Sequence, residues 1–116
     1  MQNGNSKQVY CPSRSCVKNK SVHNQISEQL LQKYFSLTGE ALEKVKQSPH
    51  CADREKEALD FLDMAQRYYD DALHFYKKGE YVLAYGAVYY AHAWLDAGAR
   101  LGLFKVKDSR LFVVDD

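Results

Sequence analysis

The chain has 116 residues, enough for one small domain with a buried core but not for a second domain with its own active site. Its 16 Lys and Arg residues nearly balance its 15 Asp and Glu residues, so the net charge of +1 gives no reason to expect nucleic acid as a partner. No apolar run reaches the roughly 18 residues of a membrane-spanning helix, and the polar beginning of the chain lacks the apolar core of a signal peptide. We therefore expect a cytoplasmic protein with reduced thiols and no membrane partner.

Residues 1–24 show no apolar periodicity and are rich in Asn, Ser, Lys and Gln, which is typical of a disordered or loosely packed extension. This extension contains Cys11 and Cys16, and Cys51 makes the cysteine count odd. Zinc sites usually combine a tighter cysteine pair with a matching second pair. A metal site of Cys11, Cys16, Cys51 and the adjacent His50 is one interpretation. Reduced thiols without metal are the favoured one, and no cofactor is expected.

A first helix is predicted from the apolar residues that follow the extension at helical spacing. Ser27 can cap its beginning, and Pro49 ends it. Gly39 is a weak point inside it, because Gly costs about 1 kcal/mol relative to Ala in a helix. The predicted stripe consists of Ile26, Leu30, Leu31, Tyr34, Phe35, Leu37, Ala41, Leu42 and Val45.

A second helix is predicted from about Asp53 to Lys78. Asp53 can cap its beginning. Two lysines followed by Gly79 are typical of a helix end, where cations suit the helix dipole and Gly takes the left-handed conformation. Its predicted core stripe consists of Ala58, Leu62, Ala65, Tyr69, Ala72 and Tyr76, with Phe61, Tyr68 and Phe75 beside it.

A third helix is predicted from about Glu80 to Leu101, with Gly102 closing it. It is apolar almost all round, which indicates a central, well-covered helix, one too apolar for a bundle that covers only one of its sides. One line of small residues on it lets another helix approach closely, and larger residues occupy the adjoining line. The small line consists of Ala84, Ala87, Ala91 and Gly98, and the larger line of Leu83, Tyr90, Trp94 and Leu101.

Residues 103–116 form a C-terminal arm, in which "LFKVKDSRLFVV" has two apolar runs around a polar turn. This pattern is compatible with a short hairpin or with an extended arm, and either must dock on the helices to be stable. Short connections make the helices antiparallel neighbours. The predicted fold is therefore all-α, an up-down-up bundle of three helices over residues 25–102, followed by the arm.

The segment from Met64 to Phe104 resembles a mostly archaeal family, the domain of unknown function 357. The resemblance is carried by "YYDDALHFYKKGEY" and "YAHAWLDAGARLGLF", and it extends more weakly from Ile26 to the C-terminus. It implies a small helical bundle and supplies no activity, cofactor or catalytic residue. The "FYKKGEYVLAYGAVYYAHAWLD" hairpin is also similar to the turn of a tetratricopeptide repeat, although no second copy follows at about 34 residues.

The predicted binding residues lie on one face of the third helix. His92, Asp96 and Arg100 are spaced four residues apart and share this face, which tyrosines extend toward the beginning of the helix. The face is either an ordinary solvated stripe with an Asp96–Arg100 pair or a binding stripe, because Tyr and Arg are good anchors at interfaces. The complete predicted set is Tyr81, Tyr85, Tyr89, His92, Asp96 and Arg100.

The second helix offers two weaker enzymatic interpretations. Arg67 and His74 fit the loose Arg-to-His spacing of the higher-eukaryote and prokaryote nucleotide-binding ribonucleases, which they resemble in this spacing alone. Asp71 and His74 imitate half of a di-iron site, but no acidic residue lies three positions before His92 to supply the other half. A cluster of Asp63 and Arg67 with the polar residues of the third helix is a further expectation, if the two stripes meet.

The favoured function is a non-enzymatic helical interaction module. It would self-associate or bind a protein partner through the Tyr-rich edge of the second and third helices and through the arm. The alternative is a nucleotide- or RNA-handling enzyme that uses Arg67 and His74.

Overall fold

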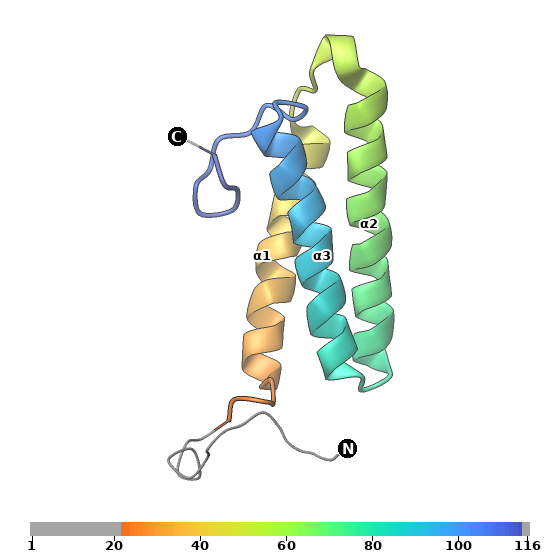
Figure 1. Ribbon diagram of the computed structural model, residues 1–116, viewed down its shortest axis with the longest axis vertical. Coiled ribbons are helices and arrows are strands. Elements are labelled where there is room, and N and C mark those ends of the chain that lie inside the picture. The colour runs from red at the N-terminus through yellow and green to blue at the C-terminus, as the bar shows by residue number, and fades with distance from the viewer. Residues whose placement is uncertain (1–21, 115–116) are drawn as a thin grey trace, which may run out of the picture.

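In the computed structural model, which describes residues 22–114, three long helices run up, down and up and pack side by side (Figure 1). The helices are α1 (Glu28–Gln47), α2 (Glu55–Lys77) and α3 (Tyr81–Arg100), and the short 3-10 helix η2 (Ala52–Arg54) precedes α2. The predicted three-helix, all-α architecture is confirmed. The predicted N-terminal extension lies almost wholly outside the described residues.

Helix α1 begins as predicted, because the Ser27 side chain accepts a hydrogen bond from the Leu30 amide at 3.1 Å. It ends at Gln47, where the Ser48 amide and hydroxyl both donate to the Val45 carbonyl. Gly39 does not interrupt the helix. The Tyr69 hydroxyl would lie 2.8 Å from a Cβ at this position, so the missing side chain makes room for α2.

Helix α2 begins two residues later than predicted. Asp53 belongs to η2, and no side-chain cap is present at the start of η2 or of α2. The predicted cap at Asp53 is therefore wrong: a 3-10 turn tightens the chain before the α-helix starts. The other end is as predicted, because Gly79 has a φ of +79°, the left-handed conformation that favours glycine.

The buried core lies between α1, α2 and one side of α3. Ala58, Ala65 and Ala72 of α2 are fully buried, and three of the four small residues predicted on α3 are buried against them. A Cβ at Gly98 would collide with the Phe104 ring, so this glycine makes room for the arm rather than for a helix. The predicted line of small residues is thus buried, although its last member receives the arm.

Helix α3 is well covered on one side only, and apolar side chains remain exposed on the other. Val82, Leu83, Tyr90 and Leu101 are 71%, 51%, 48% and 54% exposed. Helices α1 and α2 both pack on the buried side of α3, so its opposite side faces solvent. Among residues 22–114, no helix combines the length and the apolar content that crossing a bilayer requires.

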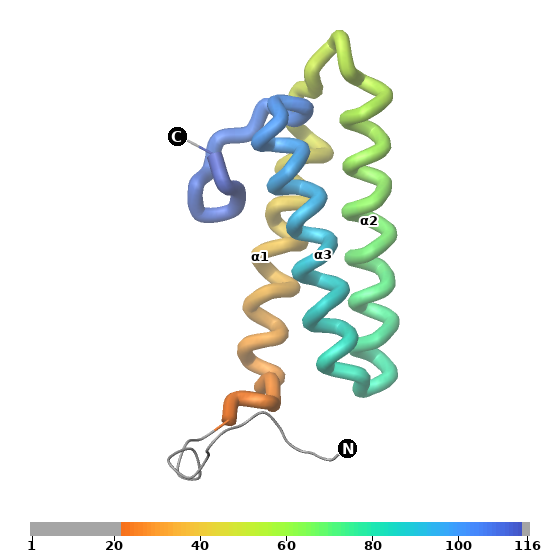
Figure 2. Tube along the Cα trace, in the orientation of Figure 1, coloured from red at the N-terminus to blue at the C-terminus, as the bar shows by residue number. Residues whose placement is uncertain are grey.

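The C-terminal arm continues from α3 and folds back along the side of α3 that lies away from α2 (Figure 2). Gly102, with a φ of +79°, turns the chain out of the helix. Four arm residues are buried in the core: Leu103, Phe104, Leu111 and Phe112. Two forms were predicted for the arm, and the hairpin is absent from residues 103–114. The β-type pairing of these residues is limited to an isolated bridge between His50 and Phe104. The arm turns at residues 108–112.

Candidate interaction surface

Tyr81, the first predicted binding residue, lies where α1 meets the turn between α2 and α3. Its hydroxyl donates to a Glu28 carboxylate oxygen at 3.1 Å, and the Tyr76 hydroxyl donates to the other oxygen at 2.6 Å. The two tyrosine rings stack with their centroids 5.4 Å apart. These hydrogen bonds, from Tyr76 first and Tyr81 second, lower the pKa of Glu28. Tyr81 therefore ties the beginning of α1 to the hairpin.

Tyr85 and Tyr89 contact α1 in the same way. The Tyr34 ring lies 5.4 Å from that of Tyr85 and 5.0 Å from that of Tyr89, measured between centroids. Tyr85 is partly buried, whereas Tyr89 is half exposed. Hydrogen bonding to Tyr34 and then to Tyr85 raises the pKa of Tyr89. The predicted Tyr-rich edge is thus largely the contact between α1 and α3.

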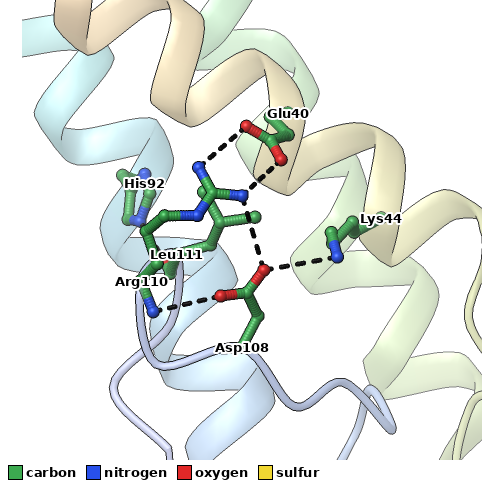
Figure 3. Close-up of polar contacts among 6 residues, drawn as sticks. All are labelled: Glu40, Lys44, His92, Asp108, Arg110 and Leu111. Carbon is green, nitrogen blue, oxygen red and sulfur yellow. Dashed lines mark hydrogen bonds and ion pairs between the residues drawn. The ribbon is translucent and has the colours of Figure 1, made fainter.

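His92 holds the arm against the bundle (Figure 3). Its Nε2 lies 2.7 Å from the Leu111 carbonyl oxygen, and its Nδ1 lies 2.8 Å from the Thr38 hydroxyl. Because a carbonyl oxygen only accepts, Nε2 carries the proton, and Nδ1 of a neutral ring accepts from Thr38. One side chain thus joins α1, α3 and the arm.

Asp96 and Arg100 line a hollow of about 480 Å³ between α3 and the arm. Asp96 accepts a hydrogen bond from the Val113 amide at 3.1 Å. The structure shows no Asp96–Arg100 ion pair among the described residues, and Arg100 is exposed. The carboxylate is therefore engaged by the arm, and the guanidinium lies at the rim of the hollow.

Two ion pairs fasten the outside of the arm to α1 (Figure 3). Both terminal nitrogens of Arg110 bind the Glu40 carboxylate, which lowers the pKa of Glu40. Lys44 lies 3.3 Å from the Asp108 carboxylate. All four groups are partly exposed, so these pairs contribute little to stability.

A small cavity of about 130 Å³ lies between α1, α3 and the arm. It is lined by Tyr34, Leu37, Thr38, Val88, Tyr89, His92 and Arg110. Its walls are mainly apolar, and its volume suits one benzene-sized group at most, since an engineered cavity of about 150 Å³ binds benzene. Of its lining side chains, the Thr38 hydroxyl and His92 Nδ1 are hydrogen-bonded to each other at 2.8 Å.

The expected cluster of polar residues from α2 and α3 does not form. Arg67 binds Asp63 one turn away on α2 at 2.7 Å, while His92 and Asp96 face α1 and the arm. The two polar stripes lie on different sides of the hairpin. His74, the partner of Arg67 in the enzymatic interpretation, is exposed, with its ring 6.0 Å from that of Phe75.

The predicted metal ligands are only partly described. Cys11 and Cys16 lie outside the described residues. No group of three or more potential ligands occurs among residues 22–114. His50 contacts Glu55 and the Phe104 ring, and hydrogen bonding to Arg54 lowers the pKa of Cys51.

An uncharged stripe runs along the solvent side of α3, and we name it the α3 seam. It consists of Leu83, Gly86, Tyr90, Ala93, Ala97 and Leu101. All six residues are exposed, none is charged, and successive members are three or four residues apart. A soluble helix normally presents charged residues on such a side, so this apolar stripe indicates a surface for association.

Helix α2 widens the seam into a groove of about 250 Å³, lined by Phe61, Tyr90, Ala93, Trp94 and Ala97. The Phe61 ring packs edge-on against Trp94 at 5.0 Å between centroids. Trp94 Nε1 is buried and has no hydrogen-bond acceptor among the described residues. We call the α3 seam and this groove together the outer face.

Sequence reasoning recognised Leu83, Tyr90, Trp94 and Leu101 as a line of large residues but did not include them in the predicted binding set. The contact of His92 with Leu111 had no signal in the sequence, because nothing in the arm's pattern specifies where it docks.

The comparisons with known proteins agree with the predicted resemblance. The family described as "Protein of unknown function (DUF357)" has a model that matches residues 33–104. The match includes Met64–Phe104 and most of α1, but it leaves out the arm after Phe104, to which the predicted resemblance extended. Neither the curated proteins nor the solved structures gave a significant match, so the likeness to a tetratricopeptide hairpin stays a prediction.

All six residues of the α3 seam fall inside the matched region. Because the match spans more than half of the chain, the protein belongs to this family, Protein of unknown function (DUF357).

Proposed function

We propose that the protein is a non-enzymatic, cytoplasmic interaction module that binds a helix of a protein partner on its outer face. The single observation that supports this proposal is the exposed, uncharged α3 seam. An amphipathic helix lays its apolar side into such a groove through residues spaced three or four apart.

The proposal differs in place from the Tyr-rich edge expected from the sequence. Tyr81 and Tyr85 already contact α1, and His92 and Asp96 already contact the arm. A partner at that edge would have to displace these contacts. On the outer face, a partner would only have to displace water from apolar side chains, which is the favourable direction.

An apolar dye tests the outer face directly. We expect ANS to fluoresce with the wild-type protein at the lowest protein concentration that gives a signal. In Ala93→Glu, a charge in the centre of the seam should reduce this fluorescence several-fold, because exposed apolar surface becomes polar.

Ser36→Glu is the matched control. Ser36 is an exposed small residue of α1, so its change adds the same charge away from the outer face. Its dye fluorescence should equal that of the wild type. Wild-type protein that stays monomeric and binds no dye would contradict the proposed function.

A further inference from the structure

We propose that the partner of the outer face is a second copy of this chain, packed with its α3 antiparallel to the first. This inference rests on the proposed function and adds the identity of the partner. It follows from the spacing of the seam, from its lack of charge, from its area and from the composition of the rest of the chain.

The α3 seam has the spacing of a coiled-coil contact. Leu83, Gly86, Tyr90, Ala93 and Ala97 follow one another at intervals of three, four, three and four residues. This is the alternation that keeps one side of a helix facing a partner helix. The buried side of α3 already contacts α1 and α2, so the seam is a second, separate packing surface.

The seam is complementary to itself when two copies run antiparallel. A two-fold axis between Tyr90 and Ala93 sets each Tyr90 ring opposite Ala93 of the other copy. The same axis sets Gly86 opposite Ala97, where two small residues let the helices approach closely. A two-fold interface requires this reciprocity, because each patch contacts its own copy.

The absence of charge favours self-association in particular. Around a two-fold axis, a charged residue near the centre meets the same charge on the other copy and repels it. The α3 seam has no such residue among its six positions. On α2, Tyr68 packs against Tyr90 of the seam, and the adjacent Arg67 is paired with Asp63 at 2.7 Å.

The outer face comes close to the area that a stable dimer needs. Helix α3 has 20 residues and is therefore about 30 Å long, and two adjacent helices present a surface about 20 Å wide. The resulting planar area is roughly 600 Å². The accessible area is larger than this, because the side chains give the surface relief, and a standard interface buries about 800 Å² on each partner. The half-exposed Leu83, Tyr90 and Leu101 supply the apolar part of this area.

The chain's own N-terminal segment is a poor alternative occupant. Residues 1–21 are mostly polar, and their apolar residues other than cysteine are Met1, Val9, Tyr10 and Val17. Only Tyr10 and Val17, seven residues apart, could share a helical face, and two residues cannot cover the six positions of the α3 seam. A second copy, in contrast, provides the complementary stripe in full.

Sedimentation equilibrium of the full-length chain tests the proposal. We expect a monomer–dimer equilibrium for the wild type. Ala93→Glu should raise the dissociation constant by roughly 100-fold or more, because two unpaired carboxylates would be buried near the axis. Ser36→Glu should leave the constant unchanged. Far-UV circular dichroism checks that both variants remain helical.

The emission of Trp94 provides a second readout at the interface. It is the only tryptophan in the chain and lies in the groove. Dilution of the wild type should shift its emission to longer wavelength as the dimer dissociates. Ala93→Glu should show the shifted emission at every concentration, and Ser36→Glu should follow the wild type.

Three results would overturn the proposal. A dimer that Ala93→Glu leaves intact would place the contact elsewhere. A wild-type monomer that binds ANS on the outer face would exclude self-association and leave the proposed function standing, with a different protein as partner. A monomer that binds no dye would contradict both.

Discussion

Two glycines of α3 have opposite roles, although both lie inside the helix. At Gly98 a Cβ would lie 2.2 Å from Cε2 of Phe104, a ring that is 1% exposed. At Gly86 no atom lies within 4 Å of a Cβ. Gly98 is therefore required for packing of the arm, whereas Gly86 only lowers the helix propensity of the monomer.

Alanine substitutions separate these roles. Gly98→Ala should lower the free energy of unfolding by at least about 1 kcal/mol, because overpacking against Phe104 outweighs the gain in helix propensity. Gly86→Ala should raise it by about 0.5–1 kcal/mol. Urea denaturation of dilute protein measures both values. Stabilisation by Gly98→Ala would show that Phe104 moves aside at little cost.

At the scale of elements, the arm is attached by two kinds of contact. Leu111 and Phe112 are 3% and 2% exposed and lie in the core. The pair between Arg110 and Glu40 lies outside, with both side chains about half exposed. Apolar burial is worth more than an exposed ion pair, so the apolar residues hold the arm and the ion pair sets its position.

Truncation of one residue of each kind tests this ranking. Phe112→Ala should lower the free energy of unfolding by about 3–5 kcal/mol, the usual cost of removing a buried ring. Arg110→Ala should cost less than about 1 kcal/mol. Hydrogen exchange of the amides between Asp108 and Val113 should accelerate strongly in the first variant and little in the second. Equal costs would show that the ion pair carries the attachment.

At the scale of the whole molecule, tyrosine hydroxyls connect all three helices. Burial raises the pKa of Tyr69, and hydrogen bonding to Glu28 raises the pKa of Tyr76 and Tyr81. Hydrogen bonding to Tyr34 raises the pKa of Tyr89. A raised pKa means that folding favours the protonated phenol. The contribution of these phenols to the stability of the folded protein is complete below the unfolded pKa of about 10, and it is lost as pH rises toward the folded pKa.

The free energy of unfolding should therefore decrease above about pH 10. In Tyr89→Phe, the slope of the free energy of unfolding against pH should be smaller by the equivalent of up to about one proton. The reason is that the Tyr89 phenol, which loses its proton in the unfolded state but keeps it in the folded state, is absent. Tyr90→Phe is the control, since Tyr90 has the same exposed fraction of 48% but packs against Tyr68. Urea denaturation followed by circular dichroism from pH 8 to 12 measures the slopes. Equal slopes for the wild type and Tyr89→Phe would contradict the role assigned to this hydroxyl.

Much of the fold could be predicted from local signals. Ser27 caps α1 because its side chain needs only the amide three residues later. Gly79 ends the α2–α3 hairpin because few other residues tolerate its φ. The conformation of the arm was harder to predict, because it depends on the contact of Leu111 with the distant His92 and not on the arm's own β-like pattern.

The sequence did not indicate which side of α3 stays exposed, and the reason is physical. In an amphipathic helix, the polar side indicates which side faces solvent. Helix α3 is apolar almost all round, so its sequence does not indicate the exposed side. The six predicted binding residues stay a prediction, and the structure places Tyr81, Tyr85, His92 and Asp96 in contact with α1 or the arm.

The sequence by itself determined three helices, their antiparallel order and the small residues that let them pack. Only the tertiary structure decided that α1 and α2 both pack on the small-residue side of α3 and leave its line of larger residues exposed as part of the seam. The reason is that apolar attraction has no direction, so either stripe could have received α1. The choice was made by contacts between residues far apart in the chain, such as Tyr34 with Tyr85 and Thr38 with His92.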